Sequence, residues 1–152
     1  RITQSIAIIA YLGATRPAPP LLPSDVGDAA HVRALALTVA CDIHPLNNLR
    51  VLRYLGALGH EEPVRDDWYR HWVREGFIAL EGLAKPRAGR FLFGDSPTLA
   101  DVCLVPQMFN ARRFKLPLEE FPVLVRADAE ASTLPAFAAA HPDRVAQAAA
   151  AR

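Results

Sequence analysis

A histidine, two asparagines and an arginine cluster around a proline, and together they could bind an anion. Pro45 lacks a backbone donor and disfavours a helical conformation at His44, whereas Asn47 and Asn48 favour turns and helix starts. We therefore expect one helix to end here and another to begin. The free N–H groups at a helix start suit an anion. Because a first helical turn is a poor place for a cation, Arg50 suggests a ligand carboxylate.

Three further side chains could bind a carboxylate, although each also has a simpler interpretation. Gln4 and Ser5 stand at the start of the first apolar segment, where hydroxyl, amide and free N–H groups suit a carboxylate. A simple helix cap is the commoner role at such a position. Arg113 offers a planar, bidentate partner for a dicarboxylate, but most arginines are solvated surface residues, and this alternative also applies to Arg50.

The composition indicates one ordinary globular domain and excludes several kinds of partner. The 152 residues are 51% hydrophobic and 22% charged, and a net charge of +1 gives no argument for nucleic acid or an acidic membrane surface. No apolar run approaches the ~18–20 residues that span a bilayer, and no secretory signal is recognisable. Cys41 and Cys103 fit neither a metal site nor a disulfide framework, which suggests a reducing cytoplasm. No metal-ligand spacing joins the histidines His31, His60, His71 and His141.

The segments that must position these residues are all expected to be helices. Apolar residues at helical spacing predict helices over residues 5–13, 25–43, 49–56, 67–84, 99–115, 122–132 and 134–140. Thr3 and Ser5 are candidate caps for the first. Four prolines in residues 17–23 predict a stiff linker between two structural units, and residues 60–67 are expected to form a loop.

Two of these helices carry further predictions. The helix over residues 67–84 has one apolar stripe through Trp68 and Trp72 and another through Tyr69, so both stripes are expected in the core. Thr98 and Asp101 have the spacing of an N-terminal capping box, a structural role, for which Thr98→Ala should cost about 1 kcal/mol. Within that helix, Pro106 should cause a kink and Arg112 is expected at the surface.

Several motifs together resemble the zeta class of the glutathione transferases, over nearly the whole chain. In chain order they are QSIAII with YL (residues 4–12), PLLP (20–23), IHPLNNLRVL (43–52), GD (94–95), TLAD (98–101), CLVPQ (103–107) and NARRFK (110–115). The resemblance implies the last helix of a thioredoxin-like α/β domain at residues 1–14, a linker at 15–24 and a helical C-terminal domain at 25–152. The covered chain is thus expected to be all-α. It begins at Arg1 without an initiator Met, so we expect a fragment of a longer protein.

The resemblance also implies roles for individual residues. Glutathione would be contacted by Gln4, Ser5, His44, Asn48, Leu49 and Arg50. Gln4 and Ser5 would bind its γ-glutamyl end, and His44 would bind without transferring a proton. Arg50 and Arg113 would bind the carboxylates of a cis-enone dicarboxylate substrate. The family's catalytic Ser/Cys-rich motif is expected upstream, so no catalytic residue is predicted here and the fragment alone should be inactive.

The implied activity is the glutathione-dependent cis–trans isomerisation of maleylacetoacetate or maleylpyruvate in the degradation of aromatic compounds. The resemblance further implies a cytoplasmic homodimer. Two alternatives remain open: a conjugating or dehalogenating transferase of the same class, and a binding module without turnover. A Ser-Ser-Cys-like motif in the preceding region of the gene product would favour an enzyme.

Overall fold

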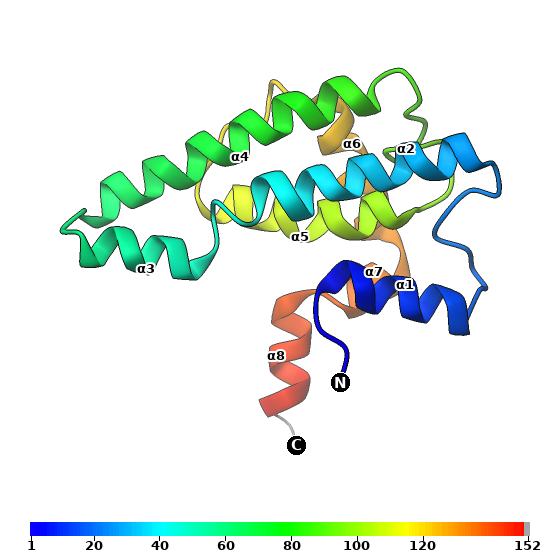
Figure 1. Cartoon of the computed structure of the whole chain (residues 1–152), viewed down its shortest axis with the longest axis horizontal. Helices are drawn as coiled ribbons and strands as arrows, with labels where there is room; N and C mark the ends of the chain where they lie inside the picture. Colours follow the sequence, from blue (N-terminus) through cyan, green and yellow to red (C-terminus); the bar gives the residue numbers. More distant parts are fainter. Residues whose placement is uncertain (151–152) are drawn as a thin grey trace.

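The computed structural model describes residues 1–150, which form helices joined by turns and loops (Figure 1). The helices are α1 (Ser5–Thr15), α2 (Val26–Leu37), η1 (Thr38–Ile43), α3 (Leu49–Ala57), α4 (Glu62–Ala84), α5 (Leu99–Arg113), α6 (Pro122–Thr133), α7 (Pro135–Ala139) and α8 (Pro142–Ala150). Within residues 1–150, β pairing is limited to an isolated bridge between Ala88 and Gly94. The all-helical prediction is therefore confirmed.

The hydrophobic core forms where α5 packs against α2 and α6, and α4 packs against η1 and α6 (Figure 1). Fully buried side chains from these helices meet there, including Val32, Leu35, Val73, Phe77, Leu80, Leu104, Met108 and Leu124. None of the residues of α1 is buried, although Ile6 and Ile9 pack against the core. The core thus belongs to residues from α2 onward.

The sequence did not predict η1, a π-helical turn that continues α2. The His44 N–H donates to the Val39 carbonyl, five residues back, at 2.9 Å. α4 packs closely against this turn because Gly76 has no side chain: a Cβ there would collide with the buried Ile43. π-turns inside helices are frequent at functional sites. This one fixes the point at which the chain enters the polar turn of residues 44–48.

α4 differs from its prediction in both its start and its buried face. It begins at Glu62, so the supposed loop forms its first turns; Pro63 is accommodated there because its missing N–H has no partner in a first turn anyway. The stripe formed by Tyr69, Val73, Phe77 and Leu80 is buried, as expected. Trp68 and Trp72, however, are only half-buried, and Leu83 further along their stripe is 44% exposed. The prediction that both stripes lie in the core was wrong.

The N-terminal cap of α5 is confirmed as a capping box. The Thr98 hydroxyl accepts from the Ala100 N–H at 3.3 Å, and the Asp101 carboxylate accepts from the Thr98 N–H at 2.8 Å. The same carboxylate also accepts from the Leu92 N–H at 2.9 Å, which ties the preceding loop to the helix. α5 then continues through Pro106 to Arg113.

Residues 16–25 form no helix and connect α1 to α2. This segment is fixed to α5 by a hydrogen bond from the Leu99 N–H to the Leu21 carbonyl at 2.8 Å. The division into two domains and a linker stays a prediction. Among the helices described, none combines the length and apolarity required to cross a membrane.

Candidate functional site

The first candidate region is the start of α1, where Gln4 has an unusual backbone conformation. Its φ is 73° and its ψ 122°, and no side chain caps the helix. The expected caps, Thr3 and Ser5, were therefore wrong, because Gln4 is the N-cap and makes no capping bond. Non-glycine residues with positive φ are strained, and such residues concentrate at binding sites. With N–H groups left uncapped and Ser5 exposed, this helix start suits a carboxylate.

The second region is the turn between η1 and α3. The Asn48 side chain accepts from the Arg50 N–H at 3.0 Å, so Asn48 is the N-cap of α3. His44 ends η1 in a helical conformation (φ −60°, ψ −37°), which corrects the expectation that Pro45 would exclude it. The steric preference before proline was overridden because the His44 N–H completes the π-turn.

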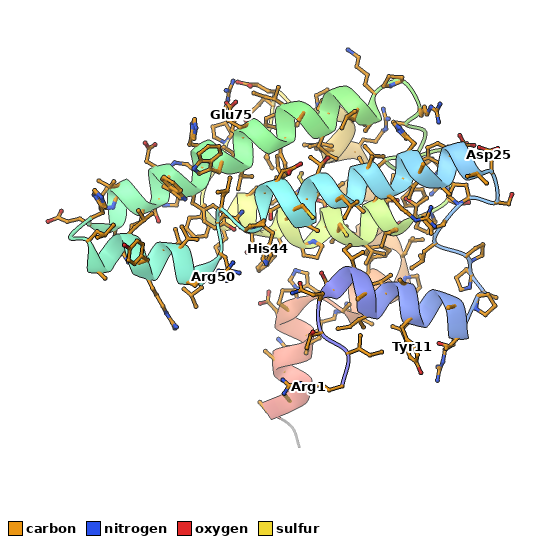
Figure 2. All side chains as sticks on the ribbon, in the orientation of Figure 1. Arg1, Tyr11, Asp25, His44, Arg50 and Glu75 are labelled. Carbon is orange, nitrogen blue, oxygen red and sulfur yellow. The ribbon has the colours of Figure 1, made fainter. Side chains whose placement is uncertain are left out.

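This turn presents its polar side chains to solvent. His44 and Arg50 are exposed, Asn48 is half-buried, and Leu49 is 58% exposed. Figure 2 labels His44 and Arg50 at the two ends of the turn that joins η1 to α3. The indole N–H of Trp68 on α4 donates a hydrogen bond to the Leu46 carbonyl at 2.8 Å, which anchors the turn to α4. A backbone tied to α4 thus carries exposed groups that can donate hydrogen bonds.

Arg113 lies at the C-terminal end of α5, where a cation interacts favourably with the helix dipole. Its guanidinium carbon is 5.8 Å from the centroid of the Phe114 ring. Phe114 in turn stacks on Tyr69, with ring centroids 3.6 Å apart and planes within 6°. The aromatic pair gives the exposed arginine a fixed base.

The ion pairs distinguish Arg113 from its neighbour. Arg112 is exposed, as expected. It also contacts the buried carboxylate of Asp128 on α6 at 2.6 Å and so joins two helices, which the sequence did not predict. Among the residues described, no acidic side chain pairs with Arg113 or Arg50. Both arginines are therefore available to an anionic ligand.

The structure adds two polar residues that the sequence analysis did not assign to the site. Asn47 and Gln107 are almost fully buried, at 4% and 2% exposure. The Asn47 amide nitrogen lies 3.5 Å from the Gln107 amide oxygen. Both residues occur inside the quoted motifs, but their separation of 60 positions in the sequence concealed the contact.

The two thiols of the described chain lie in different surroundings. Burial raises the pKa of Cys103 to about 11, which keeps it protonated at neutral pH. Cys41 is exposed on η1. Among residues 1–150, no three or more His, Cys, Asp or Glu side chains are grouped so that they could hold a metal ion. Within the described part of the chain, the arrangement offers free backbone N–H groups and unpaired guanidinium groups, both of which suit an anion.

Comparison with known proteins gives close relatives of one kind. The chain is 48% identical over 143 residues to the probable maleylacetoacetate isomerase of Vibrio cholerae, covering 93% of this chain and 66% of the relative. It is 47% identical over 146 residues to the maleylacetoacetate isomerase of Rhizobium meliloti, covering 95% and 68%. The chain thus spans about two thirds of the length of these curated relatives. No protein-family model matches it.

Solved structures give the same result. The holo structure of maleyl pyruvate isomerase, a bacterial glutathione S-transferase in the zeta class, superimposes with a TM-score of 0.91 and 45% identity, covering 94% of this chain and 69% of that one. The maleylacetoacetate isomerase of Anaeromyxobacter dehalogenans with glutathione bound in its active site superimposes with a TM-score of 0.90 and 45% identity, covering 94% and 65%.

Proposed function

Because this chain belongs to the family of maleylacetoacetate and maleylpyruvate isomerases, in the zeta class of the glutathione transferases, we propose that it provides one wall of a glutathione-dependent isomerase site. The substrate would be maleylacetoacetate, maleylpyruvate or a similar cis-enone dicarboxylate. The observation that carries the proposal is the pair of exposed arginines, Arg50 and Arg113, without acidic partners among the described residues, on a chain so similar to these isomerases.

The residues described fit glutathione, a tripeptide with two carboxylates and several amide groups. The uncapped start of α1 at Gln4 and Ser5 suits a carboxylate. In the turn between η1 and α3, the side chains of His44 and Asn48 can form hydrogen bonds to glutathione. Leu49 offers it exposed apolar surface. When bound, glutathione supplies a thiol that can add reversibly to the double bond of the substrate, which permits rotation of that bond.

In this mechanism the chain's own residues bind and orient the reactants. Arg50 and Arg113 would hold the substrate carboxylates, since a guanidinium matches a carboxylate in two parallel hydrogen bonds. Their positive charge would also stabilise negative charge that develops on the conjugated carbonyl. We assign no nucleophile or base to the residues described, and the group that activates the thiol would come from a part of the protein outside residues 1–150.

Arg113→Ala in the full-length protein tests the assignment. We expect the KM for maleylpyruvate to rise about ten- to a hundredfold, the effect of losing a hydrogen-bonded charge pair, while glutathione still binds. Isomerisation is followed by ultraviolet absorbance and glutathione binding by calorimetry. Arg53→Ala is the matched control, because Arg53 is exposed on α3 one turn from Arg50. Equal kinetics for Arg113→Ala and Arg53→Ala would remove Arg113 from the site.

We further infer that the protein is a cytoplasmic homodimer. The support for a dimer is the apolar side chains exposed on α2 and α4: Leu37 is 40%, Ile78 46% and Leu83 44% exposed. Two unpaired cysteines favour a reducing compartment. Light scattering on the purified full-length protein should give twice the chain mass. A monomer at micromolar concentration would contradict the dimer and leave the isomerase proposal unaffected.

A further inference from the structure

Two buried carboxamides connect the turn of residues 44–48 to the middle of α5. Asn47 contributes its amide nitrogen and Gln107 its amide oxygen, 3.5 Å apart, at the long limit for a hydrogen bond. With exposures of 4% and 2%, both side chains have lost almost all their contact with water. Their interaction joins segments 60 residues apart in the sequence.

The pair is incompletely satisfied. Among the described residues, the Asn47 amide oxygen and the Gln107 amide nitrogen have no hydrogen-bond partner. Buried polar atoms normally have one, and an apolar side chain of similar shape at such a position is often as stable or more so. Stability of the fold therefore gives a weak reason for the pair, and a role at the site is the better explanation.

Each member of the pair adjoins one part of the proposed site. Asn47 directly precedes Asn48, and its own N–H donates to the Ile43 carbonyl at 3.3 Å. Burial raises the pKa of the Tyr69 hydroxyl, and the nearby Gln107 side chain partly offsets this shift, although no hydrogen bond of good geometry joins the two side chains. Tyr69 stacks on Phe114, which lies under the Arg113 guanidinium. The buried pair thus lies between the turn and the arginine.

We propose that Gln107 is a positioning residue, which holds Asn47 and with it the turn carrying His44, Asn48 and Arg50 in register with Arg113. This inference rests on the proposed function, because the groups that it positions are those assigned to glutathione and substrate. Gln107 itself is buried in α5 and is assigned no contact with either ligand. The hydrogen bond from the Asn47 amide to the Gln107 amide oxygen gives the turn a directional anchor that apolar packing, which lacks direction, would not provide.

Gln107→Met in the full-length protein is the principal test, since methionine matches glutamine in length and removes the carboxamide. We expect the glutathione Kd and the maleylpyruvate KM each to rise about tenfold, the effect of one lost positioning hydrogen bond. The midpoint of urea unfolding should stay the same or rise. Amide hydrogen exchange of residues 44–50 should become faster. Met108→Leu, a volume-conserving change at a fully buried neighbouring position without a carboxamide, is the control and should change none of these.

A double-variant cycle separates positioning from general packing. If the two carboxamides act together, Asn47→Leu should reproduce the effects of Gln107→Met, and the double variant should add little to either. Additive effects would overturn the proposal, as would a loss of stability with unchanged exchange and binding. If the wild-type protein has no isomerase activity, the proposed function fails. Amide hydrogen exchange of residues 44–50 in the two variants still decides whether Gln107 positions the turn.

Discussion

Asp101→Asn should destabilise the protein more than any other conservative change at a helix cap of this chain. The carboxylate is fully buried and accepts three hydrogen bonds: from the Leu92 N–H at 2.9 Å, the Thr98 N–H at 2.8 Å and the Thr98 hydroxyl at 2.9 Å. Asparagine has the same shape, but one of its two terminal atoms is an NH₂ donor. One of the three donors must therefore face another donor or lose its partner.

The size of the effect follows from two opposing contributions. Hydrogen bonds to a charged acceptor contribute about 1.5–3 kcal/mol, and a buried donor without a partner costs about 1–3 kcal/mol. Burial, however, raises the pKa of Asp101, which means that the native carboxylate carries a desolvation cost that asparagine avoids. We therefore expect a net loss near the lower end, about 2 kcal/mol, or roughly 4–8 °C in Tm.

Urea unfolding monitored by circular dichroism, at fixed pH, measures this loss. The matched control is Asp25→Asn at the exposed N-cap of α2, where the carboxylate accepts only the Asp28 N–H at 2.9 Å and where Asn caps about as well as Asp. Its cost should be a few tenths of a kcal/mol at most. If Asp101→Asn were no more destabilising than Asp25→Asn, the reasoning from burial and hydrogen bonds would be refuted.

Comparison of the wild-type protein with Asp101→Asn also predicts how the stability difference changes with pH. A pKa above the ordinary value of 3.8 means that the folded protein binds the Asp101 proton more tightly than the unfolded chain does. The contribution of this proton to stability is fully present below 3.8 and is lost as the pH rises through the folded-state pKa. The loss of stability caused by Asp101→Asn, measured against the wild-type protein at the same pH, should therefore be larger near pH 3.8 than at neutral pH.

Three other predictions concern single side chains. Glu81 on α4 accepts the first two free N–H groups of α6 at 3.0 and 3.1 Å, so Glu81→Ala should lower the free energy of unfolding by about 2 kcal/mol in urea titrations; a change below 0.5 would contradict the capping role. With its pKa at about 11, Cys103 should resist iodoacetamide at pH 8 until the protein unfolds, whereas exposed Cys41 should react first, as judged by peptide mass spectrometry. Burial and then Arg87 lower the pKa of His31, so stability should fall as the pH drops below the ordinary value of 6.5, and thermal melts of His31→Gln should lack that part of the fall.

Features that depend on neighbouring residues could be predicted from the sequence. The Thr98–Asp101 capping box joins positions three apart, and Asn48 caps a helix that begins at the next residue. Both follow from the preference of short polar side chains for free backbone donors. The difference at the start of α4 is also local: a proline such as Pro63 is typical of loops, but it is equally well tolerated in a first helical turn.

The features that escaped prediction are contacts between helices. Glu81 caps a helix more than forty residues away, Arg112 reaches Asp128 on the next helix, and Asn47 meets Gln107 across the core. No periodicity encodes such pairs, because the partners are brought together only when the apolar faces pack. For the same reason, the exposed residues of the site could be assigned roles from the sequence, whereas the buried pair Asn47 and Gln107 could not.

The helix ends explain why Arg50 and Arg113 carry unequal weight as evidence for a ligand. Arg113 stands in the last turn of α5, where the dipole stabilises a cation by roughly 0.3–1 kcal/mol, so its presence has a structural explanation even without a substrate. Arg50 stands in the first turn of α3, where the same dipole opposes it. Its side chain is exposed and has no acidic partner among the described residues, so the fold gains nothing evident from its charge. A bound carboxylate would reverse that balance, and Arg50 is therefore the stronger indication of an anionic ligand although Arg113 has the better-defined support.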